Sequence, residues 1–410
     1  MQLRLTRTTK IRGVRKQVKG PNQVKSRGRL REEHDLIRAQ LRRFVEEKVK
    51  PHGPQWEQAG FVPRSVLREM GELGFLSLRV PEALGGSGLD ARASVILAEE
   101  VGRSTFGGFA ITVLVHTDMA SPHLVRFGSK RQHERYLPGV MAGRTITAVA
   151  VTEPGTGSDV AGIRTRAVRD GDSYVLNGAK MFITNGVHGD LYFVAARTDP
   201  AAKGSRALTM FMVEKGTPGF HVGRALDKTG WRCSDTAELV FEDCRVPSEN
   251  VLGEENRGFY AIMANFQTER LVIGAMAMAE AREALRLTFE HVNQRIAFGV
   301  PLWEKQAIRQ RLSRRLAEVE AARQLVHHTA SLDARGVDCV AQVSMVKALA
   351  GDLVNAVLYD CVQFHGGMGF VRESAIERMA RDARVQAIGG GASEVMLEEI
   401  AKRFGQVLSD

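Results

Sequence analysis

One acidic residue stands beside one arginine in a largely apolar stretch near the middle of the chain. The segment NFQTERLVIG places Glu269 next to Arg270, and a carboxylate held away from water can act as a general base. Because adjacent residues of a helix do not share a face, the two side chains should point in different directions. Taken alone, this pair is more typical of a solvated helix surface with a local ion pair than of a catalytic site.

A second segment of interest is AIGGGASEVM at residues 387–396, where three consecutive glycines precede a helix that opens at Ser393. Glycines suit a sharp turn or a backbone that lies close against a ligand. They supply no side chain, so chemistry at this place would need a group from elsewhere in the chain.

Metal and phosphate-loop signals are weak. The four cysteines, at positions 233, 244, 339 and 361, have no CxxC spacing and no nearby histidine pair, so we expect no metal and a reducing compartment. The segment GTGSDV lacks the third glycine of a dinucleotide fingerprint. The longest uncharged apolar stretches, such as residues 271–279, are too short for a bilayer, and we therefore expect no membrane span.

The net charge of +10 comes from the beginning of the chain. Residues 1–31 contain eleven Lys or Arg and no acid, and the remainder is nearly neutral. Such a tail is typical of a disordered, solvated extension. An Arg-rich, acid-free tail also fits a mitochondrial transit peptide, although this one is poor in serine. Nucleic-acid binding is a third interpretation, which the absence of interleaved aromatic residues disfavours.

Hydrophobic periodicity divides the rest of the chain into three parts. Apolar spacings of three and four predict helices from about residue 32, one of them stopped by Pro51 and another ended by Pro138. Near Thr145 the period changes to two, which predicts an antiparallel β domain with a hairpin at Asp170-Gly171. Helices return from Gly258, with one of more than 30 residues and two others at about 303–333 and 337–364.

These changes predict an α+β protein with helical, β and helical parts in that order. We place the basic extension at residues 1–30, an N-terminal α domain at 31–145, a β domain at 146–256 and a helical bundle at 257–410. No alternation of single strands and helices occurs, which disfavours a doubly wound nucleotide-binding sheet.

Five segments carry a resemblance to a known family. They are VTEPGTGSD (151–159), NGAKMFITNG (177–186), CSDTAELVFEDCRVPSENVLG (233–253), QRIAFGVPLWEKQAI (294–308), and QFHGGMGF with RDARVQAIGGGASE (363–394). In this order they resemble the acyl-CoA dehydrogenases, over roughly residues 32–405. The resemblance implies an N-terminal helical domain, a middle β domain and a C-terminal four-helix bundle.

The family resemblance also implies an activity and a base. The family desaturates acyl-CoA thioesters at the α,β bond, with FAD as hydride acceptor. Many members carry the base as a glutamate followed by Gly-Thr in the C-terminal loop, where this chain has Gly390-Gly391-Ala392. The long-chain and isovaleryl-CoA branches instead carry it on the long helix, at the position of Glu269, which we therefore identify as the catalytic base.

The resemblance implies further contacts to the substrate. Straight-chain enzymes commonly have Tyr at the position of Gly389, and the glycine opens space for a branched or long acyl chain. Ala392 replaces the usual Thr or Asn and removes one polar cofactor contact. The expected substrate-binding residues are Ser158, Gln267, Arg270, Gly389 and Gly390.

Flavin contacts are expected from two regions. By resemblance, Val151, Thr152, Phe182, Ile183 and Thr184 lie along the flavin ring, with Phe replacing the family's usual Trp, and Ser158 contacts the FAD phosphates or the pantetheine of the substrate. Without the resemblance, a Pro-Gly turn and a core aromatic would explain most of these residues. The pyrophosphate and adenosine contacts are expected from Arg295, Phe298, Gln306, Gln363, Gly366, Gly367, Ser393 and Glu394.

Several of the latter residues come from a neighbouring subunit in the family, which implies a homotetramer built as a dimer of dimers. The implied electron acceptor is an electron-transferring flavoprotein, and the expected location is the bacterial cytoplasm or, alternatively, the mitochondrial matrix. Two other functions remain open. One is a flavin oxidase or monooxygenase on the same fold, and the other is a DNA-binding flavoprotein that uses the basic tail.

Overall fold

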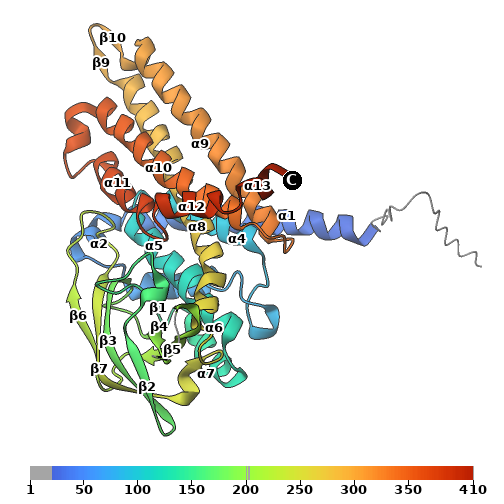
Figure 1. Ribbon diagram of the computed structural model, residues 1–410. Helices are drawn as coiled ribbons and strands as arrows, with labels where there is room; N and C mark the ends of the chain where they lie inside the picture. Colours follow the sequence, from blue (N-terminus) through green and yellow to red (C-terminus); the bar gives the residue numbers. More distant parts are fainter. Residues whose placement is uncertain (1–20, 200, 202–203, 410) are drawn as a thin grey trace, which may run out of the picture.

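The computed structural model describes residues 21–199, 201 and 204–409 (Figure 1). Helices come first, a β-sheet follows, and long helices complete the chain. In Figure 1 the sheet lies at the bottom, the long helices extend to the top, and the N-terminal helices lie partly between them and partly beside the sheet. The acidic residue of interest, Glu269, is on the helix that runs from beside the sheet into the bundle.

The N-terminal part consists of short helices. They are α1 (Pro21–Phe44) with the π-turn η1 (Val45–Val49), α2 (Gly53–Ala59), α3 (Arg64–Glu72), the 3₁₀ turn η2 (Glu82–Leu84), α4 (Ala91–Gly102), α5 (Gly107–Leu114), the π-turn η3 (Val115–Ala120), α6 (Ser121–Phe127) and α7 (Lys130–Met141).

Two helix boundaries in this part differ from the sequence-based expectation. Helix α1 begins at Pro21, within the segment expected to be a disordered extension; proline is well suited to the first turn of a helix because its missing N–H has no partner there. Residues 1–20 lie outside the described part of the chain. Helix α7 continues past Pro138 to Met141, because only one turn remains and the Pro138 carbonyl still accepts from the N–H of Ala142.

The middle part is one sheet with the strand order β6-β7-β3-β2-β4-β5-β8, and β1 pairs with β4. The strands are β1 (Thr147–Ala150), β2 (Arg166–Asp170), β3 (Ser173–Thr184), β4 (Leu191–Arg197), β5 (Leu208–Glu214), β6 (Phe220–Ala225), β7 (Thr236–Pro247) and β8 (Val251–Leu252), with 3₁₀ turns η4 (Val160–Gly162), η5 (Gly204–Arg206) and η6 (Ser248–Asn250).

The sheet is mixed rather than purely antiparallel. Strand β1 runs parallel to β4, because the chain reverses direction twice between them, once in the β2–β3 hairpin and once between β3 and β4. That hairpin is present, but Asp170 pairs with Ser173, so its turn is Gly171-Asp172, one residue later than predicted. Gly171 has a φ of 63°, which glycine adopts without strain.

The C-terminal part is the predicted helical bundle. Its elements are α8 (Gly258–Gln294), the short hairpin β9 (Ile296–Ala297) and β10 (Val300–Pro301), η7 (Leu302–Glu304), α9 (Gln306–Asp333), α10 (Val340–His365), η8 (Gly366–Phe370), α11 (Ala375–Ala383), η9 (Arg384–Ala387), α12 (Ser393–Ala401) and α13 (Phe404–Ser409). The three long helices have the extents that the periodicity predicts.

The segment Val340–Phe370 has a mean hydropathy of 1.2 and is long enough to cross a membrane. The segment contains Lys347, Asp352 and Asp360, so it is not one of the uncharged apolar stretches to which the expectation referred. Most of it is buried inside the protein, where α10 packs against α8, α9 and α12, and a core helix of a bundle passes the same test of length and composition.

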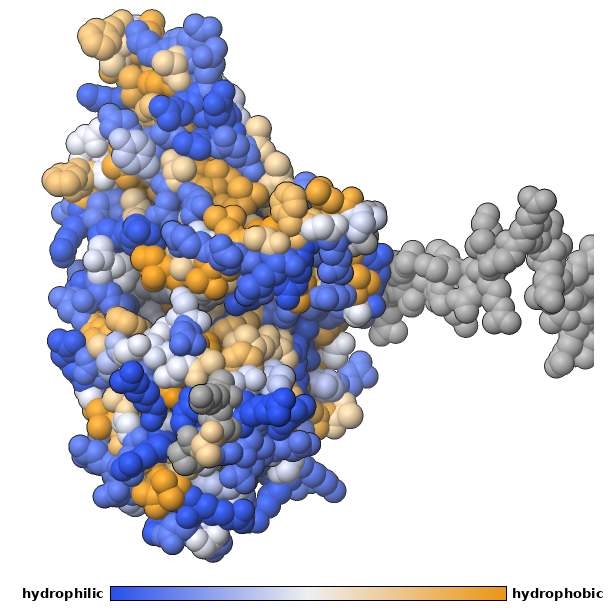
Figure 2. Space-filling model, in the orientation of Figure 1, coloured by the Kyte–Doolittle hydropathy of each residue, from blue (hydrophilic) through white to orange (hydrophobic). Residues whose placement is uncertain are grey.

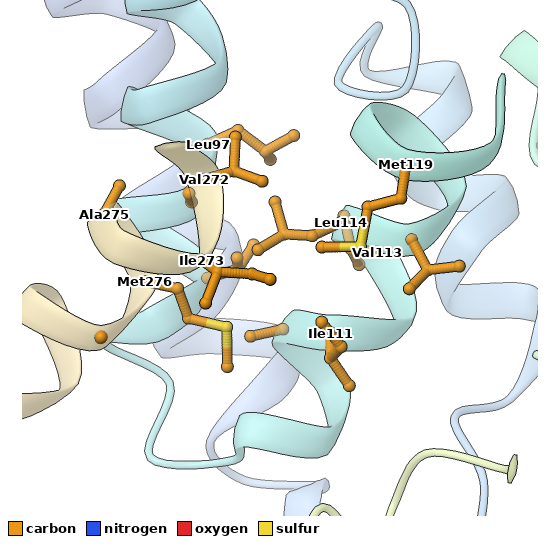
Figure 3. Packing of buried hydrophobic residues seen from close by; sticks show 14 of the residues in the cluster. Leu97, Ile111, Val113, Leu114, Met119, Val272, Ile273, Ala275 and Met276 are labelled. Atoms are coloured by element: carbon orange, nitrogen blue, oxygen red, sulfur yellow. The ribbon is translucent and has the colours of Figure 1, made fainter. Parts of the chain in front are cut away.

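A continuous apolar core fixes the position of α8. Val272, Ile273 and Met276 on α8 pack with Leu97 on α4 and with α5 and η3, as Figure 3 shows. At Gly274 an added Cβ would lie 2.3 Å from a methyl carbon of Val346 on α10. The two helices therefore approach each other as closely as they do only because residue 274 has no side chain.

Candidate active site

The Glu269 carboxyl group lies in the interior of the protein. Its residue is 7% exposed, and Oε1 accepts a hydrogen bond from Nδ2 of Asn265 at 3.0 Å. Burial raises the pKa of Glu269 from 4.5 to about 7, while the hydrogen bond from Asn265 and the charge of Arg270 act in the opposite direction. A buried carboxyl group with a pKa near neutrality suits a general base.

The glycine loop lies against α8 one turn beyond Glu269. A Cβ built on Gly390 would lie 2.5 Å from Cδ1 of Ile273, and one built on Gly391 would lie 3.7 Å from Nε of Arg270. Gly390 and Gly391 have φ angles of 68° and 104°, in the region that other residues avoid. Gly389 has only ordinary contacts, at 3.7 Å and beyond. The loop thus lies against Arg270 and Ile273, which follow Glu269 on α8 by one and four residues.

Arg270 leaves α8 in a different direction from Glu269, as expected. Its guanidinium carbon lies 5.2 Å from the centre of the Phe266 ring, and burial lowers its pKa. Its Nε is buried and has no hydrogen-bond partner among the residues that the structure describes. Lys347 on α10 is fully buried, its Nζ also lacks a partner, and burial, together with the charge of Arg270, lowers its pKa to about 8. These atoms can hydrogen-bond to an anionic or carbonyl-bearing ligand.

The other predicted site residues near the glycine loop are Gln267, Ser393 and Glu394, and none of them combines burial with an unpaired polar atom in the described part of the chain. Gln267 is half-buried on α8. The Ser393 hydroxyl donates to Oδ1 of Asp352 at 2.8 Å, so it already has a partner within the protein. Glu394 is exposed in the first turn of α12.

The β-domain residues predicted to line a flavin gather beside one loop. The N–H of Met181 donates to the carbonyl of Thr152 at 2.9 Å, and this bond ties the VTEPG loop to β3. Val151, Thr152 and Thr184 are half-exposed, and Ser158 is exposed. Ile183 is buried in the sheet core, so only its backbone is available to a ligand.

Phe182 combines an exposed side chain with an unusual backbone conformation. It is 65% exposed and has a φ of 59°, which is rare for a bulky residue and common at functional sites. The pairing of β3 with β7 shifts register between Lys180 and Ile183. This bulge turns the aromatic ring out of the sheet and leaves a flat apolar surface to be covered.

Most of the residues expected to contact the pyrophosphate and adenosine of FAD lie away from the glycine loop and from the β-domain residues. Arg295, Phe298, Gln306, Gln363, Gly366 and Gly367 are all exposed. The stacked rings of His291 and His365, with centroids 4.3 Å apart, join the end of α8 to the end of α10. Figure 1 places the β9–β10 hairpin at the far end of the bundle from the sheet, so one chain does not bring this group to the flavin-ring candidates.

This end of the bundle is unusually apolar at its surface. Phe298 is 95% exposed and Phe370 is 86% exposed, and Ile296 and Met368 are also exposed. Figure 2 shows apolar residues among the hydrophilic ones at the tip and along the bundle. Large exposed aromatics of this kind are typical of an interface with another chain.

Sequence reasoning missed three supporting residues. Lys180 is fully buried, and its Nζ donates to the carbonyl of Val151 and to Oε1 of Glu153 at 2.9 Å. Asn265 and Lys347 were also missed. Only Asn265 left a local signal, because it precedes Glu269 by four residues and such residues meet on a helix.

Among residues 21–199, 201 and 204–409, no group of three or more His, Cys, Asp or Glu side chains is arranged to hold a metal ion. The four cysteines are buried and free. Burial raises the pKa of the Cys233 thiol well above its usual value, so this cysteine is a poor nucleophile.

The chain thus has a helical part, a β-sheet and a long-helix bundle, with a buried carboxyl group on the longest of the described helices. Family models match almost the whole chain in the same order: the acyl-CoA dehydrogenase N-terminal domain at residues 31–144, the middle domain at 148–244 and the C-terminal domain at 256–405. The chain belongs to the acyl-CoA dehydrogenase family, whose enzymes are oxidoreductases.

Individual relatives agree. The chain is 40% identical to the mitochondrial long-chain specific acyl-CoA dehydrogenase of Mus musculus over 92% of this chain and 87% of the relative. It is 35% identical to the mitochondrial isovaleryl-CoA dehydrogenase of Pongo abelii over 92% of this chain and 89% of the relative. The resemblance inferred from the five segments is therefore confirmed, including both branches.

Solved structures confirm the fold. An acyl-CoA dehydrogenase from Geobacillus kaustophilus has a TM-score of 0.87 at 41% identity, covering 91% of this chain and 98% of that chain. A glutaryl-CoA dehydrogenase from Mycobacterium smegmatis, solved in complex with FADH2, has a TM-score of 0.85 at 30% identity, covering 91% and 94%.

Proposed function

We propose that this protein is an FAD-dependent acyl-CoA dehydrogenase that introduces an α,β double bond into an acyl-CoA thioester, with Glu269 as the base. The observation that carries the proposal is the buried Glu269 carboxyl group, whose pKa is about 7, beside a loop whose three glycines supply no acid. Of the family's two alternative base positions, the one on α8 holds a carboxyl group in this chain and the one in the C-terminal loop holds glycine.

The base acts on the α carbon. Ionised Glu269 removes the α proton, and the bond from Asn265 to Oε1 holds the carboxylate in one orientation. The β hydrogen leaves as a hydride, which FAD accepts when it is bound. Negative charge develops on the thioester oxygen, and we propose backbone N–H groups of the glycine loop as its donors.

The residues present fit a flavin. Phe182 offers an exposed aromatic face on a strained backbone, the half-exposed Thr152 and Thr184 offer hydroxyl groups beside it, and Lys180 holds the loop that carries Thr152. We assign Val151, Thr152, Phe182 and the backbone of Ile183 with Thr184 to the ring. Ser158 is assigned to the FAD phosphates or to the pantetheine of the substrate.

We assign Gln267, Arg270, Gly389 and Gly390 to the substrate. Arg270 and Lys347 carry buried nitrogens without partners, which favours a polar ligand group in this region. Gly389 has room for a side chain, so the space beside the reacting carbons is open, and we propose a long or branched acyl group.

We further propose that the site is completed by a second subunit. Arg295, Phe298 and Gln306 lie in or beside the β9–β10 hairpin, which Figure 1 places at the far end of the bundle from the sheet. Gln363, Gly366 and Gly367 lie at the end of α10, which the His291–His365 stack joins to the end of α8. The exposed aromatics there suit a subunit interface. A homotetramer with paired sites accounts for this separation. The proposed electron acceptor is an electron-transferring flavoprotein, and the proposed location is the bacterial cytoplasm, with the mitochondrial matrix as the alternative.

The test is an anaerobic titration of the flavin-loaded protein with short, branched, medium and long acyl-CoA thioesters, followed by its visible absorbance. The expected result is that one of these classes of thioester bleaches the oxidised flavin. That class is then the substrate class. A flavin that no thioester bleaches would overturn the proposal. Rapid reoxidation of the bleached enzyme by air would instead make it an oxidase.

A further inference from the structure

Three acceptor oxygens converge on the side-chain nitrogen of Asn265. Nδ2 lies 3.0 Å from Oε1 of Glu269, 2.9 Å from the carbonyl oxygen of Met119 and 3.2 Å from that of Asp118. Asn265 is fully buried. The convergence fixes the orientation of the amide, because the reverse orientation would place Oδ1 against three acceptors. Oδ1 is buried and finds no partner within the described part of the chain, so the arrangement carries a cost in stability.

The two carbonyls come from the π-turn η3, whose path is set locally. The N–H of Ser121 reaches back five residues to the carbonyl of His116, and Pro122 has no N–H to give to the carbonyl of Asp118. The Asp118 side chain is held by hydroxyl groups, Ser94 Oγ at Oδ1 and Thr117 Oγ1 at Oδ2, the latter at 2.7 Å. Isolated π-turns of this kind are frequent at functional sites.

We propose that Asn265 is a positioning residue for the reaction, which anchors on the carbonyls of η3 and directs the Glu269 carboxylate toward the substrate. The proposal rests on the proposed function, because it takes Glu269 as the base. The amide nitrogen is a donor only, so its bond is strongest when Glu269 is ionised, and it favours the form of the base that can accept a proton.

Other charged groups surround this pair. Arg270 on α8 favours the ionised form of Glu269. The Asp118 carboxyl on η3 is fully buried, and burial raises its pKa. Arg79 donates to Oγ1 of Thr268, the residue before Glu269, at 3.3 Å. The Asn265 side chain bonds to the backbone carbonyl of Asp118 but not to its carboxyl group. Replacing Asn265 therefore removes the donor that Glu269, Asp118 and Met119 share, without removing any of these charged groups.

The experiment is an infrared titration of the Glu269 carboxyl band in the flavin-loaded enzyme, with the band assigned by its loss in Glu269→Gln. The test variants are Asn265→Leu, which keeps most of the volume, and Asn265→Ser, which keeps one donor. The control is Asn293→Ala, also on α8, where the exposed amide donates to the carbonyl of Phe289.

We expect the pKa of Glu269 to rise by about one unit in Asn265→Leu, by less in Asn265→Ser, and not at all in Asn293→Ala. The pH profile of kcat should shift upward by the same amount, and kcat should recover toward the normal value at alkaline pH. An unchanged Glu269 pKa in either folded Asn265 variant would overturn the proposal. Should Glu269→Gln remain active, the base assignment fails, and the infrared shift still tests Asn265 separately.

Discussion

Ile273 occupies the space that a side chain at Gly390 would need. A Cβ on Gly390 would lie 2.5 Å from Cδ1 of Ile273, which is one helical turn beyond Glu269. The C-terminal loop is therefore packed against the turn of α8 that follows Glu269, the proposed base. If the catalytic carboxyl group is supplied by α8, the loop needs no acidic side chain and can consist of glycines. The backbone of the loop then packs directly against α8.

This relationship predicts different results at two adjacent glycines. Gly390→Ala should lower the free energy of unfolding by more than about 1 kcal/mol, because φ is 68° there and the methyl group meets Ile273. Gly389→Ala, which meets nothing closer than 3.7 Å, should be nearly neutral. Denaturant unfolding of both variants measures the difference, and equal costs would contradict the packing described.

Replacing the base should abolish turnover without loss of the cofactor. Glu269→Gln keeps the shape and the bond from Asn265 but cannot take a proton, so kcat should fall by about 10²–10⁴-fold, while flavin absorbance per protein stays unchanged. Glu290→Gln is the matched control, since Glu290 lies exposed on the same helix and pairs only with Arg286 in the described contacts. A Glu269→Gln enzyme of normal rate would remove Glu269 from the mechanism.

The same substitution should show a pH-dependent gain in stability. Burial raises the pKa of Glu269 from 4.5 to about 7, so the folded protein binds a proton there that the unfolded chain releases. The contribution of this group to stability is full below about pH 4.5 and is lost as the pH rises through about 7. The Glu269→Gln variant, which is uncharged at this position, avoids this loss.

The difference in Tm between Glu269→Gln and the natural protein should therefore grow with pH across that window and then level off. Calorimetry at a series of pH values measures it, with Glu290→Gln expected to run parallel to the natural protein. A constant difference would mean that the Glu269 pKa is not raised by folding.

The outline of the fold could be predicted from sequence because its signals are local. The choice of Glu269 as the base rests on short motifs and stays a prediction. Periodicity located α8, α9 and α10, and the glycines at 390 and 391 directed attention to Glu269. The support for the base could not be predicted, because Asn265 bonds to Asp118 and Met119, about 146 residues earlier in the chain. The parallel pairing of β1 with β4 could not be predicted for the same reason. The pairing of strands that are distant in the chain produces no periodic pattern in the sequence.

Lys180 should be needed to retain the flavin. It is fully buried and bonds to Val151 and Glu153 on the loop that carries Thr152. Lys180→Met leaves the Glu153 carboxylate buried without its cation, which should cost about 3–5 kcal/mol of stability, and it releases the loop. The ratio of flavin to protein absorbance should fall, whereas Lys215→Met, on an exposed side chain, should leave it unchanged.

Adding Glu153→Gln to Lys180→Met separates the two effects. It removes the unpaired charge and should restore part of the stability, but the bond to Val151 stays lost and flavin retention should remain low. Full recovery of flavin in the double variant would mean that the loop is held by other contacts.

Mixed subunits should regain activity that neither parent has, if the active site is shared. Glu269→Gln lacks the base near the sheet, and Arg295→Ala lacks a proposed pyrophosphate contact at the far end of the bundle. In a hybrid, the Arg295→Ala subunit keeps Glu269 and receives Arg295 from its neighbour, so one complete site forms. Mixing the two inactive variants under mild dissociating conditions should restore flavin binding and turnover in the hybrid fraction. Hybrids that form but stay inactive would mean that each chain binds its cofactor alone, and that the exposed Phe298 and Phe370 meet some other partner.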